Sequence, residues 1–196
     1  MRLNLPRRPD VERARQGVKD IERKFSSIER LLREGYDLAQ KQEYAKAVDE
    51  AGRIFYEVTE KIIYSYPWFI RCLIGRLFFS KRLRSRMRKR AAESQKRLYP
   101  SDYVYTLVEG DGKEFDFGVD YTECATCKFL NLHGAPELAP YICLCDEVYS
   151  EAFGWGLVRT TTIAEGSKKC DFRFKRGGKT GILSRISRSG WSKRLR

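Results

Sequence analysis

The chain has 196 residues, of which 42% are hydrophobic and 13% aromatic, and this composition excludes a globally disordered protein. Its formal net charge of +13 is unevenly distributed: residues 71–97 carry eleven Lys or Arg and one acid, residues 175–196 carry eight and none, and residues 101–150 carry ten acids and two lysines. An acidic segment in the middle of a basic chain would repel a phosphate backbone, which argues against a nucleic-acid-binding function.

The sequence also favours a particular compartment. Residues 1–16 contain no apolar segment of the kind found in secretory signal peptides. Six cysteines without such a signal favour a reducing environment, in which thiols stay free or bind a metal. The most apolar stretch, residues 62–79, is interrupted by Pro67, Arg71 and Arg76, which are costly in lipid. We therefore expect a cytoplasmic protein that does not span a membrane.

Two segments near the N-terminus show apolar residues at intervals of three and four, the period of an amphipathic helix. The first begins after Asp10, a suitable N-cap, and ends at Gly35 or within residues 40–42, and the second runs from Tyr44 to a point before Pro67. The short polar link between them predicts an antiparallel helical hairpin. The same apolar seam could instead join two copies of the chain in a homodimer.

A third helix is predicted over residues 68–97. It begins apolar and becomes strongly basic from residue 81. One interpretation is a helix packed through its apolar residues, with the basic residues in solvent. The other is an interfacial helix attracted to an anionic membrane surface. No aromatic residue is interleaved among residues 81–97, which argues against binding of single-stranded nucleic acid.

After residue 100 the pattern changes to alternating apolar residues, which are typical of strands. The expected elements are strands over 103–110 and 114–121 joined by a Gly110–Gly112 turn, helices over 122–134 and 136–154, and strands over 157–166 and 170–177 joined around Gly166 and Ser167. The fold class is therefore α+β, in which an N-terminal helical hairpin or bundle packs with a small, mainly antiparallel sheet of about four strands. Two further helices lie on one face of that sheet.

Three regions follow from these elements. Residues 1–98 form the helical region, residues 99–177 form the α+β region that carries the chemistry, and residues 178–196 form a basic tail. The tail consists largely of Gly, Ser and Arg and has little to bury, so we expect it to be flexible.

Five of the six cysteines fall in the second region. Cys124 and Cys127 form a C-x-x-C at a predicted helix start, where the first-turn amides lower the pKa of a thiol. Cys143 and Cys145 form a C-x-C, and Cys170 opens the last predicted strand. One interpretation is a zinc ion held by Cys124, Cys127, Cys143 and Cys145. Against it, alternate residues of a helix face different sides, so Cys143 and Cys145 should not point to one metal ion. We expect no metal and keep zinc as the alternative.

Residues 118–174 resemble the L-2-amino-thiazoline-4-carboxylic acid hydrolase family. The features that carry the resemblance are the T-x-C ending at Cys124, the G-x-x-E-L from Gly134 to Leu138 and Asp146 after a cysteine-bearing helix. The most specific feature is R-T-x-T-x-x-x-G from Arg159 to Gly166, followed by C-D-F-R-F from Cys170. The resemblance implies hydrolysis of a cyclic S/N amidine, in which water opens the ring and gives a carbamoylated cysteine.

The requirements of that reaction point to particular side chains. A thiolate could attack the amidine carbon, and Cys124 and Cys170 are the candidates. A carboxylate could direct water to that carbon or hold the protonated amidine, and Asp146 or Asp171 could serve. Arg159 could bind the substrate carboxylate. The predicted catalytic residues are therefore Cys124, Cys170 and Asp146, and the predicted substrate-binding residues are Arg159, Thr161 and Asp171.

Each of these residues could instead have a purely structural role. Arg159 could simply form an ion pair with an acid. Asp171, next to Cys170 on a strand, should point to the opposite face, whereas Thr161 should share a face with Arg159. The functional alternative is a non-enzymatic module that uses the cysteines to bind a metal or a small ligand. In that alternative the basic helix attaches the protein to an anionic membrane or to a partner.

Overall fold

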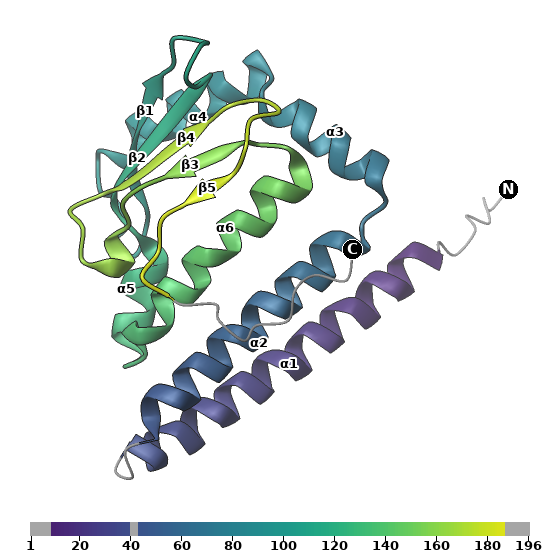
Figure 1. Ribbon diagram of the computed structural model, residues 1–196, viewed down its shortest axis with the longest axis vertical. Helices are drawn as coiled ribbons and strands as arrows, with labels where there is room; N and C mark the ends of the chain where they lie inside the picture. Colours follow the sequence, from purple (N-terminus) through teal and green to yellow (C-terminus); the bar gives the residue numbers. More distant parts are fainter. Residues whose placement is uncertain (1–8, 40–42, 187–196) are drawn as a thin grey trace, which may run out of the picture. The chain divides into compact units, whose positions relative to one another are not determined.

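The computed structural model describes residues 9–39 and 43–186 (Figure 1). The chain divides into two compact units, residues 1–51 and 52–196. Helix α1 (Pro9–Ala39) lies in the first unit, and helix α2 (Tyr44–Ser65) runs from the first unit into the second. Both helices were predicted from their periodicity. The alternative end of α1 at residues 40–42 lies outside the described residues, and the hairpin and the homodimer remain predictions.

The third predicted helix is in fact two helices. Helix α3 (Trp68–Phe78) is followed by helix α4 (Lys81–Ser94), so the prediction of one helix over 68–97 is wrong at this point. Ser80 causes the break, because its hydroxyl accepts a hydrogen bond from the amide of Leu83 at 3.2 Å and so acts as the N-cap of α4. None of the helices in the described part of the chain is long and apolar enough to cross a bilayer.

The sheet confirms the α+β class and has five strands in the described residues. In sequence order they are β1 (Val104–Glu109), β2 (Phe117–Glu123), β3 (Leu157–Arg159), β4 (Cys170–Phe174) and β5 (Gly181–Ile182), and their spatial order is β1-β2-β4-β3-β5. All neighbours are antiparallel except β3 and β5. The first predicted hairpin is present as the β1–β2 pair. β3 and β4 also pair, but the predicted strand over 157–166 is wrong beyond Arg159, because residues Ile163–Glu165 form a 3-10 helix.

Strand β5 was not predicted. It falls where a flexible tail was expected, yet Gly181 and Ile182 pair in parallel with Val158 and Arg159 of β3. A two-residue strand is too short to show any periodicity, so it depends on an existing edge to pair with. The rest of the predicted tail, residues 187–196, lies outside the described residues.

The two faces of the sheet differ in chemistry because neighbouring residues of a strand point to opposite sides. One face carries a buried aromatic and aliphatic cluster built on Phe117, Val119, Leu157 and Phe174. Residues of α3 and α4 and the residues between them pack against this cluster, among them Phe78, Phe79 and Met87. The opposite face is polar. Helices α3 and α4 therefore pack on one face of the sheet, and Cys170 lies on that face at the end where β2 and β4 approach α5 (Ala125–Leu132).

Candidate functional site

Cys124 lies at the junction between β2 and α5. It is the N-cap of the helix and keeps the extended backbone of the strand (φ −115°, ψ 116°), and the helical turn begins at the next residue, Ala125. The thiol of Cys127, one turn later, and the amides of Cys127 and Thr126 lower the pKa of Cys124 to about 6, outweighing the effect of its partial burial. Cys124 is therefore largely a thiolate at neutral pH.

Cys127 is the partner that makes this possible. Its side chain is buried, and its pKa is strongly raised because its proton is shared with Cys124. The two thiols titrate as a pair, with the first proton lost mainly from Cys124. The C-x-x-C therefore supplies one nucleophile and one hydrogen-bond donor.

Arg159 and Asp146 form an ion pair in the same region. Arg159 of β3 is 1% exposed, and its Nη1 donates hydrogen bonds to the carboxylate of Asp146 and, at 3.0 Å, to the carbonyl of Cys143. Its guanidinium lies over the ring of Phe172, 5.5 Å from the centroid. Its Nε is buried and has no hydrogen-bond partner among the described residues. Asp146 and Cys143 both belong to α6 (Ala139–Phe153), so the pair fastens this helix to the sheet.

Asp146 has an unusual pKa for a carboxyl group. Burial raises it to about 6, although Arg159 favours the ionised form, and a negative charge on Cys124 raises it further. The side chain is 29% exposed, so Asp146 is not completely sealed from solvent. An acid that titrates near neutrality next to a thiolate has the properties expected of a proton donor or acceptor in catalysis.

Cys170 and Cys143 complete the group. The sulfur of Cys170 accepts a hydrogen bond from the amide of Ile163 at 3.2 Å and contacts the hydroxyl of Thr162 at 3.5 Å, and the sulfur of Cys143 lies 3.7 Å from the same hydroxyl. Burial raises the pKa of Cys143 to about 12 and also raises that of Cys170. Both stay protonated at neutral pH, so Cys124 is the better nucleophile of the two that the sequence suggested.

The structure thus brings together Cys124, Cys170, Asp146 and Arg159. A negative charge on Cys124 raises the pKa of both Asp146 and Cys170, which shows that these groups are close enough to interact. Thr162 is a site residue that the sequence analysis missed. It is 1% exposed and connects the sulfurs of Cys170 and Cys143. Its position in the R-T-x-T run was the available signal.

Asp171 and Thr161 are placed differently. Asp171 lies in register with Asp120, on the opposite face from Cys170, as strand alternation predicted. Its carboxylate accepts hydrogen bonds from the amides of Thr160 (2.9 Å) and Thr161 (2.6 Å) and from the Thr160 hydroxyl. Burial alone would raise its pKa, but these bonds lower it. Asp171 therefore fixes the chain after β3, and substrate binding by Asp171 or Thr161 remains a prediction.

Cys145 is also apart from the group. Its sulfur is buried beside Thr59 of α2, at 3.6 Å from the hydroxyl, and it packs with Tyr56 and Val148. The C-x-C therefore directs its two sulfurs to different sides of α6, so the four cysteines of the zinc alternative do not converge. Within residues 9–39 and 43–186, no group of three or more His, Cys, Asp or Glu side chains could hold a metal ion.

A cavity of about 680 Å³, which the sequence did not reveal, is lined by residues between Met87 and Tyr105 and by Tyr121 of β2. Tyr103, Tyr105 and Tyr121 form its aromatic wall. The ring of Tyr121 makes a T-shaped contact with that of Tyr103 at 5.7 Å and a tilted contact with that of Tyr105 at 5.2 Å. The other lining residues are Met87, Arg90, Glu93, Ser94, Lys96, Leu98, Tyr99 and Asp102. Tyr121 lies opposite Cys170 in register. The Tyr103 hydroxyl is 2.8 Å from that of Thr126, and this contact links the cavity wall to the first turn of α5, which follows Cys124.

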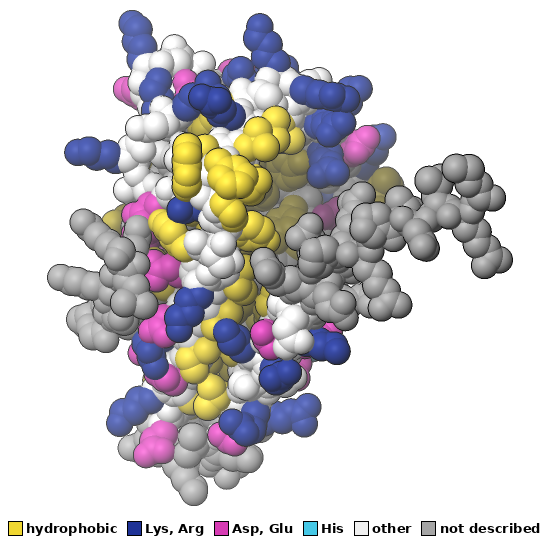
Figure 2. All heavy atoms as spheres, turned by 90° about the vertical axis from the view of Figure 1, so that its right-hand side faces the viewer, with side chains coloured by type: hydrophobic (Ala, Val, Ile, Leu, Met, Phe, Trp, Pro, Cys, Tyr) yellow, Lys and Arg dark blue, Asp and Glu magenta, His cyan; other side chains and the backbone are white. Residues whose placement is uncertain are grey.

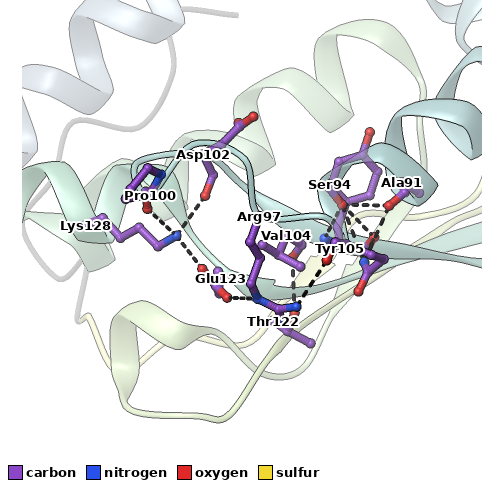
Figure 3. A network of polar contacts seen from close by, with 11 residues as sticks. Ala91, Ser94, Arg97, Pro100, Asp102, Val104, Tyr105, Thr122, Glu123 and Lys128 are labelled. Atoms are coloured by element: carbon purple, nitrogen blue, oxygen red, sulfur yellow. Dashed lines mark hydrogen bonds and ion pairs between the residues drawn. The ribbon is translucent and has the colours of Figure 1, made fainter.

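Residues 95–103 form one wall of this cavity and are held in place by a polar network (Figure 3). Lys128 of α5 donates to the carbonyls of Pro100 (2.8 Å) and Asp102 (3.0 Å) and pairs with Glu123. Arg97 donates to the same carboxylate at 2.7 Å. Arg97 has a φ of 48°, a backbone conformation that costs free energy for a residue with a side chain. The network therefore holds a strained segment against the start of α5.

The depressed pKa of Cys124 predicts a selective reaction with iodoacetamide. In a Cys72→Ser background, which removes the one exposed thiol of the described residues, we expect Cys124 to be alkylated first. Its rate should rise with pH around a midpoint near 6, measured by peptide mass spectrometry. Changing Cys127 to Ala should move that midpoint to higher pH because the donor is lost. First alkylation at Cys170, or a midpoint above pH 8, would contradict this description of the site.

Comparison with known proteins adds a family. Residues 70–174 match the model of the family described as L-2-amino-thiazoline-4-carboxylic acid hydrolase. This range begins in α3 and ends with β4, so it includes the cavity wall, α5, α6 and the cysteine group. No curated protein and no solved structure shows significant similarity to the chain.

Proposed function

The chain belongs to the L-2-amino-thiazoline-4-carboxylic acid hydrolase family, and from this premise we propose that it hydrolyses a cyclic amidine whose ring contains sulfur and nitrogen. The observation that carries the proposal is Cys124, a thiol with a pKa of about 6 at the start of α5, next to Asp146, a carboxyl group with a pKa of about 6. A thiolate and a carboxyl group that can take up or release a proton are what addition to an amidine carbon requires.

In the first step, the thiolate of Cys124 forms a bond to the ring carbon between sulfur and nitrogen. The electron pair of the carbon–nitrogen double bond moves to nitrogen, which takes a proton. The bond between this carbon and the ring sulfur then breaks, and the ring sulfur leaves with the bonding electrons. The carbon stays attached to the Cys124 sulfur as an isothiouronium group. The amides of Thr126 and Cys127 favour the thiolate form of Cys124. They therefore help the Cys124 sulfur to leave in the next step.

In the second step, water adds to the same carbon and the bond to Cys124 breaks, which restores the thiolate and leaves a carbamoyl group on the product nitrogen. Asp146 accepts a proton from the attacking water. Of the two protons of water, one ends on the product nitrogen and the other on the product sulfur. The product is a carbamoylated cysteine when the substrate is the founding compound of the family.

Arg159 acts through Asp146 in this proposal. Its Nη1 is already bonded to Asp146 and to the carbonyl of Cys143, so we assign it the role of holding the carboxylate towards the sulfurs. Arg90 and Lys96, which line the cavity, take the substrate carboxylate, and the tyrosine rings take the positive amidine. The cavity is within the usual size of small-molecule sites, roughly 300–1,000 Å³, and leaves room for a substituent on the ring.

The test is a direct assay of purified protein against L-2-aminothiazoline-4-carboxylate and cyclic amidines with larger ring substituents. Turnover should release a thiol, measured with a chromogenic disulfide, and a carbamoylated product, identified by mass spectrometry. Protein alkylated with iodoacetamide serves as the control and should be inactive. Absence of turnover across the panel, together with about one zinc per chain by elemental analysis, would overturn the proposal in favour of a metal-binding module.

A further inference from the structure

Helix α3 exposes a row of large apolar side chains. Trp68 is 70% exposed, Phe69 55%, Leu73 51% and Leu77 55%. Phe69, Leu73 and Leu77 follow at intervals of four along one side of the helix, and Trp68 lies in its first turn. Single apolar residues on a surface need no explanation, but a tryptophan, a phenylalanine and two leucines exposed on one eleven-residue helix do. We call these four residues the α3 face.

The orientation of α3 is fixed by close packing at Gly75 and Phe78. Gly75 is buried against the end of α6, where a Cβ atom would lie 2.1 Å from the carbonyl oxygen of Phe153, so no larger residue fits. At the end of α3, Phe78 stacks on Trp155 with the centroids 4.2 Å apart. Since α3 cannot rotate to bury its outer residues, the α3 face stays on the surface of this unit.

Positive charge surrounds this face. A groove of about 610 Å³ runs beside it, and Arg76 and Arg176 are its charged lining residues, with no acid among the lining residues in the described chain. The remaining lining residues are Trp68, Phe69, Cys72, Leu73, Gly75, Phe153 and Gly154. Helix α4 follows directly and is strongly basic. The upper half of Figure 2 shows hydrophobic side chains in a continuous area bordered by lysines and arginines.

We propose that the α3 face and its groove form a docking surface for an anionic phospholipid bilayer. The apolar side chains would lie at the boundary between headgroups and acyl chains, and Arg76 and Arg176 would meet the phosphates. Each Lys or Arg near an anionic bilayer contributes about 1 kcal/mol, so the basic residues of α4 add a second, longer-range attraction. Eleven residues span only about 16 Å, half of a hydrocarbon core, so α3 lies in the interface and does not cross it.

The charge of the surface favours a membrane over a second copy of the chain. In a symmetric dimer the same patch meets itself, so the arginines of one copy would face those of the other. Like charges placed opposite one another oppose association. An anionic bilayer satisfies both the apolar row and the arginines.

The experiment is co-sedimentation of the full chain with phosphatidylglycerol vesicles and with phosphatidylcholine vesicles. We expect binding to the anionic vesicles that weakens as salt rises and a loss of at least tenfold in Trp68→Ser/Leu73→Ser and in Arg76→Glu/Arg176→Glu. Leu183→Ser is the matched control, because Leu183 is 67% exposed outside the α3 face and should have no effect. Brominated lipids should quench the tryptophan fluorescence of the unmodified protein and quench much less in Trp68→Phe.

Three results would overturn the proposal. One is equal binding to both kinds of vesicle, and another is binding that survives the double substitutions. The third is a dimer in lipid-free buffer that Trp68→Ser dissociates while the unmodified protein does not bind vesicles, because the α3 face would then be a contact between two copies. Inorganic phosphate at millimolar concentration should not displace bound protein, since the apolar row needs a bilayer.

Discussion

Replacing Cys124 with serine is expected to lower kcat/KM for ring opening by about a thousandfold or more, a loss of roughly 4 kcal/mol of transition-state stabilisation. The reason is that a serine hydroxyl stays protonated at neutral pH, whereas the pKa of Cys124 is held near 6 by the Cys127 thiol and the first-turn amides of α5. The measurement is steady-state kinetics of thiol release. Circular dichroism and thermal unfolding should show an unchanged fold, since Cys124 is not part of the buried core.

The neighbouring cysteines supply the controls for this prediction. Cys145→Ser should keep most of the activity, because that sulfur faces Thr59 on the far side of α6. Cys127→Ala should remain active but require a higher pH, because it raises the pKa of Cys124 without removing the nucleophile. Full activity in Cys124→Ser would end the proposal of thiol catalysis, and loss of activity in Cys170→Ser alone would move the nucleophile to β4.

A pH profile combined with the Asp146→Asn substitution separates the role of the thiol from that of the carboxylate. Activity of the unmodified protein should rise with pH through about 6, where Cys124 and Asp146 both lose their protons. Because the two groups titrate together, the profile alone cannot assign the step. In Asp146→Asn only the ionisation of Cys124 remains. The rate of Cys124 alkylation should therefore still rise with pH, while the turnover rate falls. Such a split would identify Asp146 as the base.

The sequence was sufficient for the features that depend on local periodicity. The spacing of apolar residues predicted α1 and α2, and strand alternation placed Asp171 on the opposite face from Cys170. The C-x-C pattern correctly separated Cys143 from Cys145. In each case the relevant geometry is set by residues close in sequence, which is why the backbone repeat alone could predict it.

Other features depend on contacts between distant segments, and the sequence did not reveal them. Strand β5 exists because the edge of β3 is available, and the cavity exists because residues 95–103 are held against α5 by Lys128 and Glu123. Nothing in the sequence around Thr162 shows that two sulfurs will approach its hydroxyl. Such contacts depend on packing, which no spacing rule describes.

Replacing Arg159 with methionine is expected to destabilise the protein by about 3–5 kcal/mol at pH 7–8, because it leaves the carboxylate of Asp146 without its partner in a poorly solvated site. Arg159 is 1% exposed, so water cannot replace it without a rearrangement of α6 and β3. Methionine keeps much of the apolar volume, so the loss would come mainly from the charge. The measurement is chemical denaturation at several pH values.

The pH dependence distinguishes this mechanism from a simple packing defect. Burial raises the pKa of Asp146 to about 6 in the folded protein even with Arg159 present, compared with 3.8 for a free aspartate. A raised pKa means that the folded state holds this proton more tightly than the unfolded chain, so stability from this group is greatest below pH 4 and is lost as pH rises through 6. Without Arg159 the pKa should rise further, and the destabilisation should shrink towards pH 5, where Asp146 is protonated and needs no counter-charge.

Arg173→Met is the matched comparison. Arg173 lies on the polar face of the sheet, is 24% exposed as a side chain and pairs with Asp120, which also binds Lys169. Because solvent and a second cation remain near Asp120, the expected loss is about 1 kcal/mol. Equal losses in the two variants, or a loss in Arg159→Met that is the same at pH 5 and pH 8, would show that Arg159 acts through packing. The charge of Asp146 would then have no special part in holding α6 against the sheet.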